Sequence, residues 1–142
     1  MICQPGGTKR DNCWASGITY RIKCKPCLKD GKLAQYTGES GRSSFTRGLE
    51  HGKHFGNLKR GQPLSDHARS CHPGGNLGIE DFEMRVTGRY TRALPRLISE
   101  GIQIDELLHN KQLDPTRVEV LNSKQNFHQA RTVRVVAMDQ KF

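Results

Sequence analysis

The sequence predicts an α/β (α+β) fold in which a small antiparallel or mixed sheet of three strands is flanked by helices. Residues 18–23 and 82–87 alternate apolar with polar side chains, which is the pattern of a strand with one buried face. Between residues 94 and 108, leucine and isoleucine recur at the spacing of a long amphipathic helix. A chain of 142 residues accommodates these segments in one domain of ordinary size.

The first two strands are predicted to form a hairpin. Ile18, Tyr20 and Ile22 alternate with polar residues, and a polar hairpin loop over 28–32 leads to a short second strand over 33–37. The antiparallel pairing brings Tyr20 close to Tyr36. We expect the second strand to end at the glycine that follows residue 37.

Helices are predicted on both sides of a basic, glycine-containing loop over 57–63. Ser43 or Ser44 is a suitable N-cap for the first helix, whose expected buried stripe is Phe45, Leu49 and Phe55. The second helix is short, is expected to begin with Ser65 as its cap and ends before the Pro-Gly-Gly run at 73–75.

The two ends of the chain have weaker patterns. Residues 1–13 are rich in glycine and polar residues, so we expect an irregular arm there and place the domain at 14–142. Between these ends, the alternation over 82–87 lies within a third strand, which is expected over about 80–90. Toward the other end, a terminal strand or extended arm is indicated by Val118, Val120, Leu121, Val133, Val135 and Val136.

The charge balance favours a polyanionic partner. The chain has 23 basic and 14 acidic residues, for a formal net charge of +9, and basic proteins bind nucleic acid by neutralising phosphates and releasing counterions. A membrane fits less well, because the chain has no apolar run of the length that spans a bilayer. The first residues also lack the layout of a signal peptide. The chain is therefore expected to be soluble and intracellular.

Five cysteines include the close pair Cys24 and Cys27, whose Cys-x-x-Cys spacing is typical of a zinc knuckle. His67 and His72 have the spacing of a zinc-binding histidine pair. Together they predict a structural Zn²⁺ in a Cys2His2 clip that ties the hairpin to a later helix. A redox pair or two buried small side chains are the alternatives.

The other three cysteines are left without a role by this pattern. Cys3 and Cys13 could belong to a second zinc site whose other ligands lie upstream, and Cys71 could compete with His72 as a ligand.

A tyrosine, a glycine turn, two arginines and a histidine follow one another in Gln35-Tyr36-Thr37-Gly38-Glu39-Ser40-Gly41-Arg42-Ser43 and Phe45-Thr46-Arg47-Gly48-Leu49-Glu50-His51. With Gly17-Ile18-Thr19-Tyr20 upstream, and Glu100 and Asn122 downstream, this order resembles the GIY-YIG endonuclease superfamily over roughly residues 13–124. The first motif has an extra residue between glycine and tyrosine, and Thr37 replaces the usual branched apolar residue. The zinc pair between the motifs resembles the version carried by Penelope-like and related retroelements.

The resemblance implies a metal-dependent DNA endonuclease whose catalytic residues are Tyr20, Tyr36, Arg47, His51, Glu100 and Asn122. A carboxylate such as Glu100 suits Mg²⁺ or Mn²⁺, which bind oxygen ligands. Arg47 can fork onto a phosphate, and Tyr20 is a general base if nearby positive charge lowers its pKa. Tyr36 would position the water or Tyr20, His51 would relay a proton or bind phosphate, and Asn122 would hold the geometry.

Further basic side chains are expected to contact the DNA backbone, namely Arg42, Lys53, Lys59 and Arg60. The retroelement resemblance implies nicking of target DNA for target-primed reverse transcription, a reverse transcriptase domain in the parent polyprotein, and a nuclear location. The alternatives are a catalytically inactive zinc-stabilised module that binds nucleic acid, and a regulatory or adaptor protein that uses zinc only to fold.

Overall fold

A four-stranded mixed sheet organises the computed structural model, which describes residues 15–56, 61–74 and 77–122. The strands are β1 (Ile18–Cys24), β2 (Leu33–Ser40), β3 (Phe82–Arg89) and β4 (Val118–Val120), in the spatial order β3-β1-β2-β4. β1 pairs antiparallel with both β2 and β3, and β4 pairs parallel with β2. The predictions for 1–13, 133–136, Lys59 and Arg60 lie outside the described residues.

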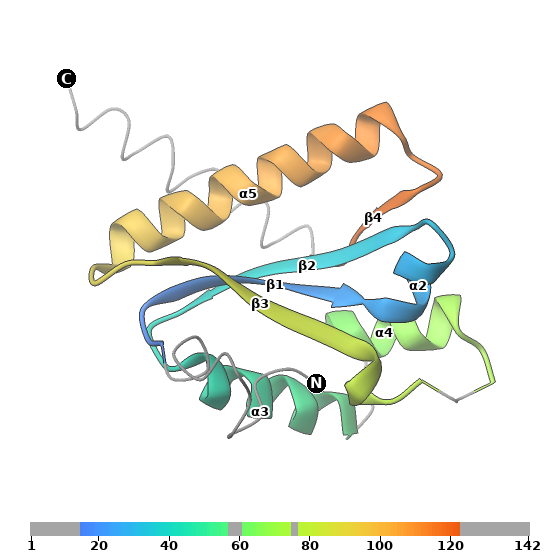
Figure 1. The fold of residues 1–142 in the computed structure, drawn as a ribbon, viewed down its shortest axis with the longest axis horizontal. Coiled ribbons are helices and arrows are strands. Elements are labelled where there is room, and N and C mark those ends of the chain that lie inside the picture. The colour runs from blue at the N-terminus through green and yellow to red at the C-terminus, as the bar shows by residue number, and fades with distance from the viewer. Residues whose placement is uncertain (1–14, 57–60, 75–76, 123–142) are drawn as a thin grey trace.

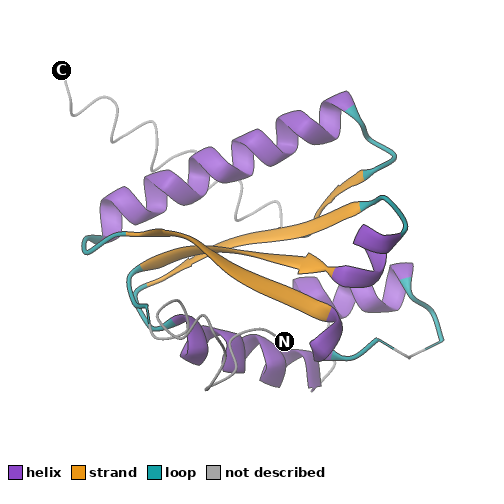
Figure 2. Cartoon of the chain, in the orientation of Figure 1, coloured by secondary structure: helices purple, strands orange, loops and turns teal. Residues whose placement is uncertain are grey.

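Helices cover both faces of the sheet. The long helix α5 (Ala93–Leu113) crosses one face, while α3 (Ser44–Gly56) and α4 (Pro63–Cys71) lie on the other (Figure 1). The single turns α2 (Lys25–Lys29) and η1 (Ile79–Asp81) lie at strand ends, as the helix and strand colours of Figure 2 make plain. No helix in the described ranges is long and apolar enough to cross a membrane.

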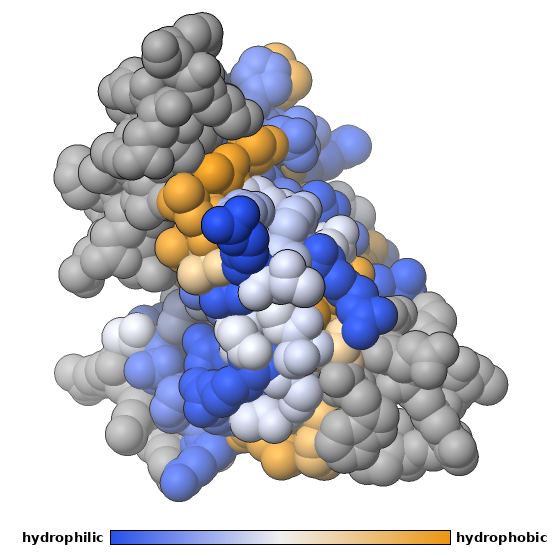
Figure 3. All heavy atoms as spheres, turned by 90° about the vertical axis from the view of Figure 1, so that its left-hand side faces the viewer, coloured by the Kyte–Doolittle hydropathy of each residue, from blue (hydrophilic) through white to orange (hydrophobic). Residues whose placement is uncertain are grey.

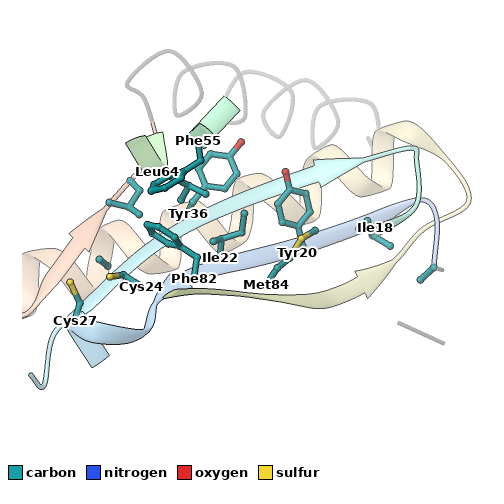
Figure 4. Packing of buried hydrophobic residues seen from close by; sticks show 13 residues of the cluster. Ile18, Tyr20, Ile22, Cys24, Cys27, Tyr36, Phe55, Leu64, Phe82 and Met84 are labelled. Atoms are coloured by element: carbon teal, nitrogen blue, oxygen red, sulfur yellow. The ribbon is translucent and has the colours of Figure 1, made fainter. Parts of the chain in front are cut away.

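The main core lies between the sheet and the α3–α4 layer. The alternation predicted for the first strand is confirmed, because Ile18, Tyr20, Ile22 and Cys24 are all fully buried on this face. Figure 4 shows these side chains in one row, with the two tyrosine hydroxyls projecting from the same side of the sheet. The cluster is completed by Ala15, Cys27, Ala34, Tyr36, Phe55, Leu64, Phe82, Met84 and Leu121.

The prediction of three strands is wrong, because β4 adds a fourth. It has only three residues, all half-buried, and pairs with Leu33, Ala34 and Gln35 of β2. So short a strand gains its stability from an existing sheet edge rather than from its own sequence.

The expected polar loop over 28–32 is also wrong in its first half, because α2 continues to Lys29. Pro26 supports this helical turn, since proline fits the first turn of a helix. The chain then turns at Gly31, whose φ is +74°.

The predicted cap of α3 is confirmed, whereas its buried stripe and the start of α4 differ from prediction. Ser43 is the cap of α3, because its Oγ accepts the Thr46 backbone N–H at 3.2 Å. Leu49 is not in the buried stripe and is 60% exposed, while His51 takes the inner position instead. α4 begins at Pro63 rather than after Ser65, since proline starts a helix without losing a needed donor.

Gly38 does not end β2, which continues to Ser40. In the register of the hairpin Gly38 lies opposite Tyr20, and a Cβ atom on Gly38 would lie 2.4 Å from Tyr20 Cζ. The glycine therefore provides the space across which the Tyr20 ring lies, and it does so inside the strand.

We predict that Gly38→Ala lowers the free energy of unfolding by about 1–3 kcal/mol, because the new methyl group displaces the buried Tyr20 ring. Urea unfolding measures the change. Gly56→Ala is the matched control, since a Cβ there meets nothing within 4 Å. A Gly38→Ala protein as stable as the Gly56→Ala protein would contradict this close approach.

Candidate functional site

Four of the predicted catalytic side chains meet at one phenol. Tyr20 Oη lies 2.8 Å from His51 Nε2, and Arg47 Nε donates a hydrogen bond to the same oxygen at 3.0 Å. The Tyr36 ring contacts both partners, with centroid distances of 6.2 Å to Tyr20 and 5.4 Å to His51. We call these residues, Tyr20, Tyr36, Arg47 and His51, the tyrosine site.

The direction of the hydrogen bonds in the tyrosine site follows from donor and acceptor chemistry. A guanidinium only donates, so the Tyr20 oxygen accepts from Arg47. Tyr20 Oη also hydrogen-bonds His51 Nε2, which accepts the phenolic proton in the imidazole tautomer protonated on Nδ1. In that tautomer Tyr20 has a proton acceptor on one side and a cation on the other.

Burial determines the resting charges. It raises the pKa of Tyr20 well above its usual value; Tyr36 adds to the rise, and the charge and hydrogen bond of Arg47 oppose it. Burial, with the charge of Arg47, lowers the pKa of His51 to about 3. The protein without bound ligands therefore has a neutral phenol and a neutral imidazole, because burial outweighs the lowering of the Tyr20 pKa that Arg47 provides.

Glu100 lies within electrostatic range of the tyrosine site from the other side of the sheet, on α5. Burial and the carboxylate of Glu39 raise the pKa of Glu100 to about 7, while Arg47 lowers it. Glu39 is itself held at 2.5 Å by the Arg96 guanidinium. A partly buried carboxylate of this kind gains from a bound cation, which stabilises its charged form.

Asn122 reaches β2 just beyond the end of β4. Its side-chain Oδ1 accepts the Thr37 backbone N–H at 3.0 Å, and its Nδ2 donates to the Thr37 carbonyl oxygen at 2.7 Å. The amide therefore continues the pairing of β4 along β2, between Tyr36 and Gly38. Asn122 holds the backbone of the tyrosine site and is not in its first layer of contacts.

The predicted phosphate contacts differ in their surroundings. The Arg42 side chain is 64% exposed and donates to Glu50 Oε2 at 3.0 Å. Lys53 is exposed in the last turn of α3. Arg47 also donates to Glu50 Oε2, at 2.7 Å.

A second group, the Cys/His cluster, lies at the opposite end of the buried row (Figure 4) and contains Cys24, Cys27, His67 and His72. Its donor atoms all lie within 4.8 Å of one another. Cys27 Sγ is 3.5 Å from His67 Nε2 and 3.4 Å from His72 Nε2, and Cys24 Sγ is 3.5 Å from His72 Nε2. The cluster could hold a metal ion and is compatible with structural zinc.

The chemistry of the donors agrees with a cation. Burial and the neighbouring Cys24 raise the pKa of the Cys27 thiol to about 12, so two thiolates at this place need positive charge. Cys27 lies in the helical turn α2, so the Cys-x-x-Cys spacing by itself also fits the redox alternative. The two histidine nitrogens beside the sulfurs remain the argument for a metal.

Two acidic residues of these sites were missed at the sequence level. Glu119, on β4, has its Oε1 atom 3.3 Å from His67 Nδ1. The exposed Cys71 Sγ lies 3.6 Å from Glu119 Oε2. No local pattern indicates Glu119, because its partner is far along the chain. Glu50 follows Arg47 at i+3, a spacing that does signal a helical ion pair. Cys3 and Cys13 lie outside the described residues.

Comparisons of the chain with protein-family models, with curated proteins and with solved structures found no match. The functional argument therefore depends on the residues themselves. Around Tyr20 they provide a hydroxyl, a proton acceptor, a fixed cation and a nearby carboxylate, which together suit acid–base chemistry on an anionic substrate.

We predict that stability depends on pH through Glu100. Its folded pKa exceeds its unfolded value of 4.5, so the folded protein binds more protons and its unfolding free energy falls as pH rises from 4.5 to about 7. Glu100→Gln removes this cost. The unfolding free energy of Glu100→Gln relative to that of the wild type should therefore rise by about 1–3 kcal/mol when the pH is raised from about 5 to about 8.

Urea unfolding in buffer without added divalent cations measures this gain. Glu106→Gln, an exposed position on the same helix, is the control. If the difference between wild type and Glu100→Gln is the same at both pH values, the carboxylate is not buried as described.

Proposed function

We propose that this chain is a DNA endonuclease domain of the GIY-YIG type, which hydrolyses a phosphodiester bond with the help of a divalent cation. The observation that carries the proposal is the meeting of Arg47 and His51 at the Tyr20 hydroxyl, beside Tyr36. These residues come from three separate elements, β1, β2 and α3. The fold therefore brings a hydroxyl, an imidazole and a guanidinium together at one place. The net charge of +9 supports a nucleic-acid substrate.

In the proposed reaction, a water oxygen attacks the phosphorus, and the bond from phosphorus to the 3′ oxygen breaks. Tyr20, once deprotonated, takes a proton from the water. His51 is the group to which Tyr20 first gives its own proton, since Nε2 lies 2.8 Å from the hydroxyl. The leaving 3′ oxygen takes up, through solvent, the proton that His51 received, so the products are a 3′ hydroxyl and a 5′ phosphate.

Arg47 has two tasks in this proposal. Its Nε holds the Tyr20 oxygen and favours the phenolate, and the N–H groups that do not bind Glu50 are left for the phosphate. Burial opposes the phenolate, so positive charge beyond Arg47 is needed. A divalent cation, Mg²⁺ or Mn²⁺, held by Glu100 would supply that charge and stabilise the phosphoryl oxygens and the leaving oxygen.

We also propose that the Cys/His cluster binds a structural zinc ion. A tetrahedron with zinc–sulfur and zinc–nitrogen bonds of the usual lengths places sulfur and nitrogen about 3.6 Å apart. The sulfur–nitrogen distances here are 3.4–3.5 Å. Zinc would join the end of β1 to α4, and the Glu119 carboxylate would orient His67 through Nδ1.

The retroelement role extends the proposal by resemblance. A 3′ hydroxyl made in target DNA would prime reverse transcription, and the reverse transcriptase domain would be the partner in the parent polyprotein. The Cys-x-x-Cys pair between the two tyrosine motifs supports this version of the endonuclease.

We predict that Glu119→Gln weakens zinc binding by about 10- to 100-fold, because it removes the carboxylate that fixes His67. Competition with a chromogenic chelator measures the affinity, and Glu106→Gln is the control for the change of charge. A Glu119→Gln protein that holds zinc as tightly as the wild type would show that His67 needs no such partner. A wild type without zinc would refute the zinc site.

We predict that the wild type nicks supercoiled plasmid with Mg²⁺ or Mn²⁺ and not with EDTA, and that Glu100→Ala lowers the rate by at least about 100-fold. Agarose gels follow the conversion to open circles, and Glu106→Ala is the matched control on α5. A folded, zinc-loaded wild type that binds DNA without cutting it would instead indicate a nucleic-acid-binding module.

A further inference from the structure

Glu50 is the anion shared by two arginines at the entrance to the tyrosine site. Its Oε2 accepts hydrogen bonds from Arg47 Nη1 at 2.7 Å and from Arg42 Nη2 at 3.0 Å. Its Oε1 forms a further ion pair with Arg42 Nη1. One carboxylate therefore bridges a cation of the tyrosine site and a cation on the rim.

The groups that hold this carboxylate are also groups that bind phosphate. A carboxylate and a phosphodiester present the same feature to a guanidinium, namely two oxygens that share negative charge. The Arg47 guanidinium bridges Glu50 to the Tyr20 hydroxyl, because Nε donates to Tyr20 while Nη1 donates to Glu50. An anion bound at this place would thus contact the same guanidinium as the proposed reactive hydroxyl of Tyr20.

The site is accessible from solvent. The Arg42 side chain is 64% exposed, while those of Arg47 and Glu50 are each 24% exposed. Seen from the end of the molecule where β2 finishes and α3 and α5 begin, the middle of the surface is a mixture of hydrophilic and neutral residues, with apolar patches at the height of α5 and at the lower edge (Figure 3). The exposure of Arg42 leaves its guanidinium within reach of a charged polymer.

We infer that the Glu50 carboxylate occupies a phosphate-binding site formed by Arg42 and Arg47, and that a nucleic-acid phosphate displaces it on binding. This inference rests on the proposed function. Glu50 holds the two arginines in place when no substrate is bound, and it competes with any weakly bound anion. Only a ligand with several phosphates, whose other contacts add to the affinity, replaces it efficiently.

Removal of the competitor should strengthen binding to DNA. We expect Glu50→Gln to bind a fluorescein-labelled DNA duplex about 3- to 10-fold more tightly than the wild type, because displacement no longer breaks two partly exposed ion pairs. Fluorescence anisotropy without added divalent cations measures affinity without cleavage. Glu106→Gln makes the same change of charge on α5 and should change affinity by less than about 2-fold.

A double-mutant cycle tests whether Glu50 acts through the arginine. In an Arg42→Ala background, the gain in DNA-binding free energy from Glu50→Gln should be at most half of its value in the wild type. One of the two ion pairs that displacement breaks is already absent there. The salt dependence gives a second readout. Arg42→Ala should reduce the slope of log affinity against log salt by about 0.9, whereas Glu50→Gln should leave it unchanged, since the same phosphates are neutralised.

Equal effects of Glu50→Gln and Glu106→Gln would overturn the inference, as would weaker binding by Glu50→Gln or a gain that Arg42→Ala does not alter. These outcomes leave the endonuclease proposal intact if the wild type nicks plasmid. A wild type that does not bind the duplex overturns the phosphate site. A wild type that binds as expected here but never cuts would refute only the endonuclease.

Discussion

The antiparallel pairing of β1 with β2 is the constraint on which the rest of the structure depends. It places Tyr20 opposite Gly38, which is two residues along β2 from Tyr36. The hydroxyls of Tyr20 and Tyr36 therefore project from the same face of the sheet. The same alternation continues to Cys24, which begins the Cys/His cluster. A shift of β1 by one residue would turn Tyr20 and Cys24 toward α5 and away from Tyr36.

The tyrosine site illustrates how a small core pays for polar function. Tyr20 and His51 are buried, and burial favours the neutral form of each. It raises the pKa of Tyr20 and lowers the pKa of His51. The cost is limited because Arg47, at the edge, supplies a donor to the phenol and keeps contact with Glu50 near solvent. Neutral groups inside and a charged pair near solvent therefore leave few polar atoms of the tyrosine site without a partner.

The two proposed metal sites would do different work. The Cys/His cluster joins β1, α2 and α4 with soft and imidazole donors, which is the composition of a structural site. Glu100 is a single carboxylate of α5 near Glu39 and Arg47, a setting that suits an oxygen-binding cation retained partly by substrate. Glu119 connects the first site to the edge strand β4, so the strand and the cluster support each other.

Local patterns along the chain were sufficient for β1, β3, α5 and the cap of α3, because each has a periodicity or capping residue that acts within a few residues. The Cys and His pairs were also visible from their spacing. Val118 and Val120 indicated a strand or extended arm, but only the folded chain revealed the pairing of β4 with β2, the inward position of His51 in place of Leu49, the continuation of β2 through Gly38, and the contacts of Glu119. Each of these depends on a partner distant in sequence, whose position no local propensity contains.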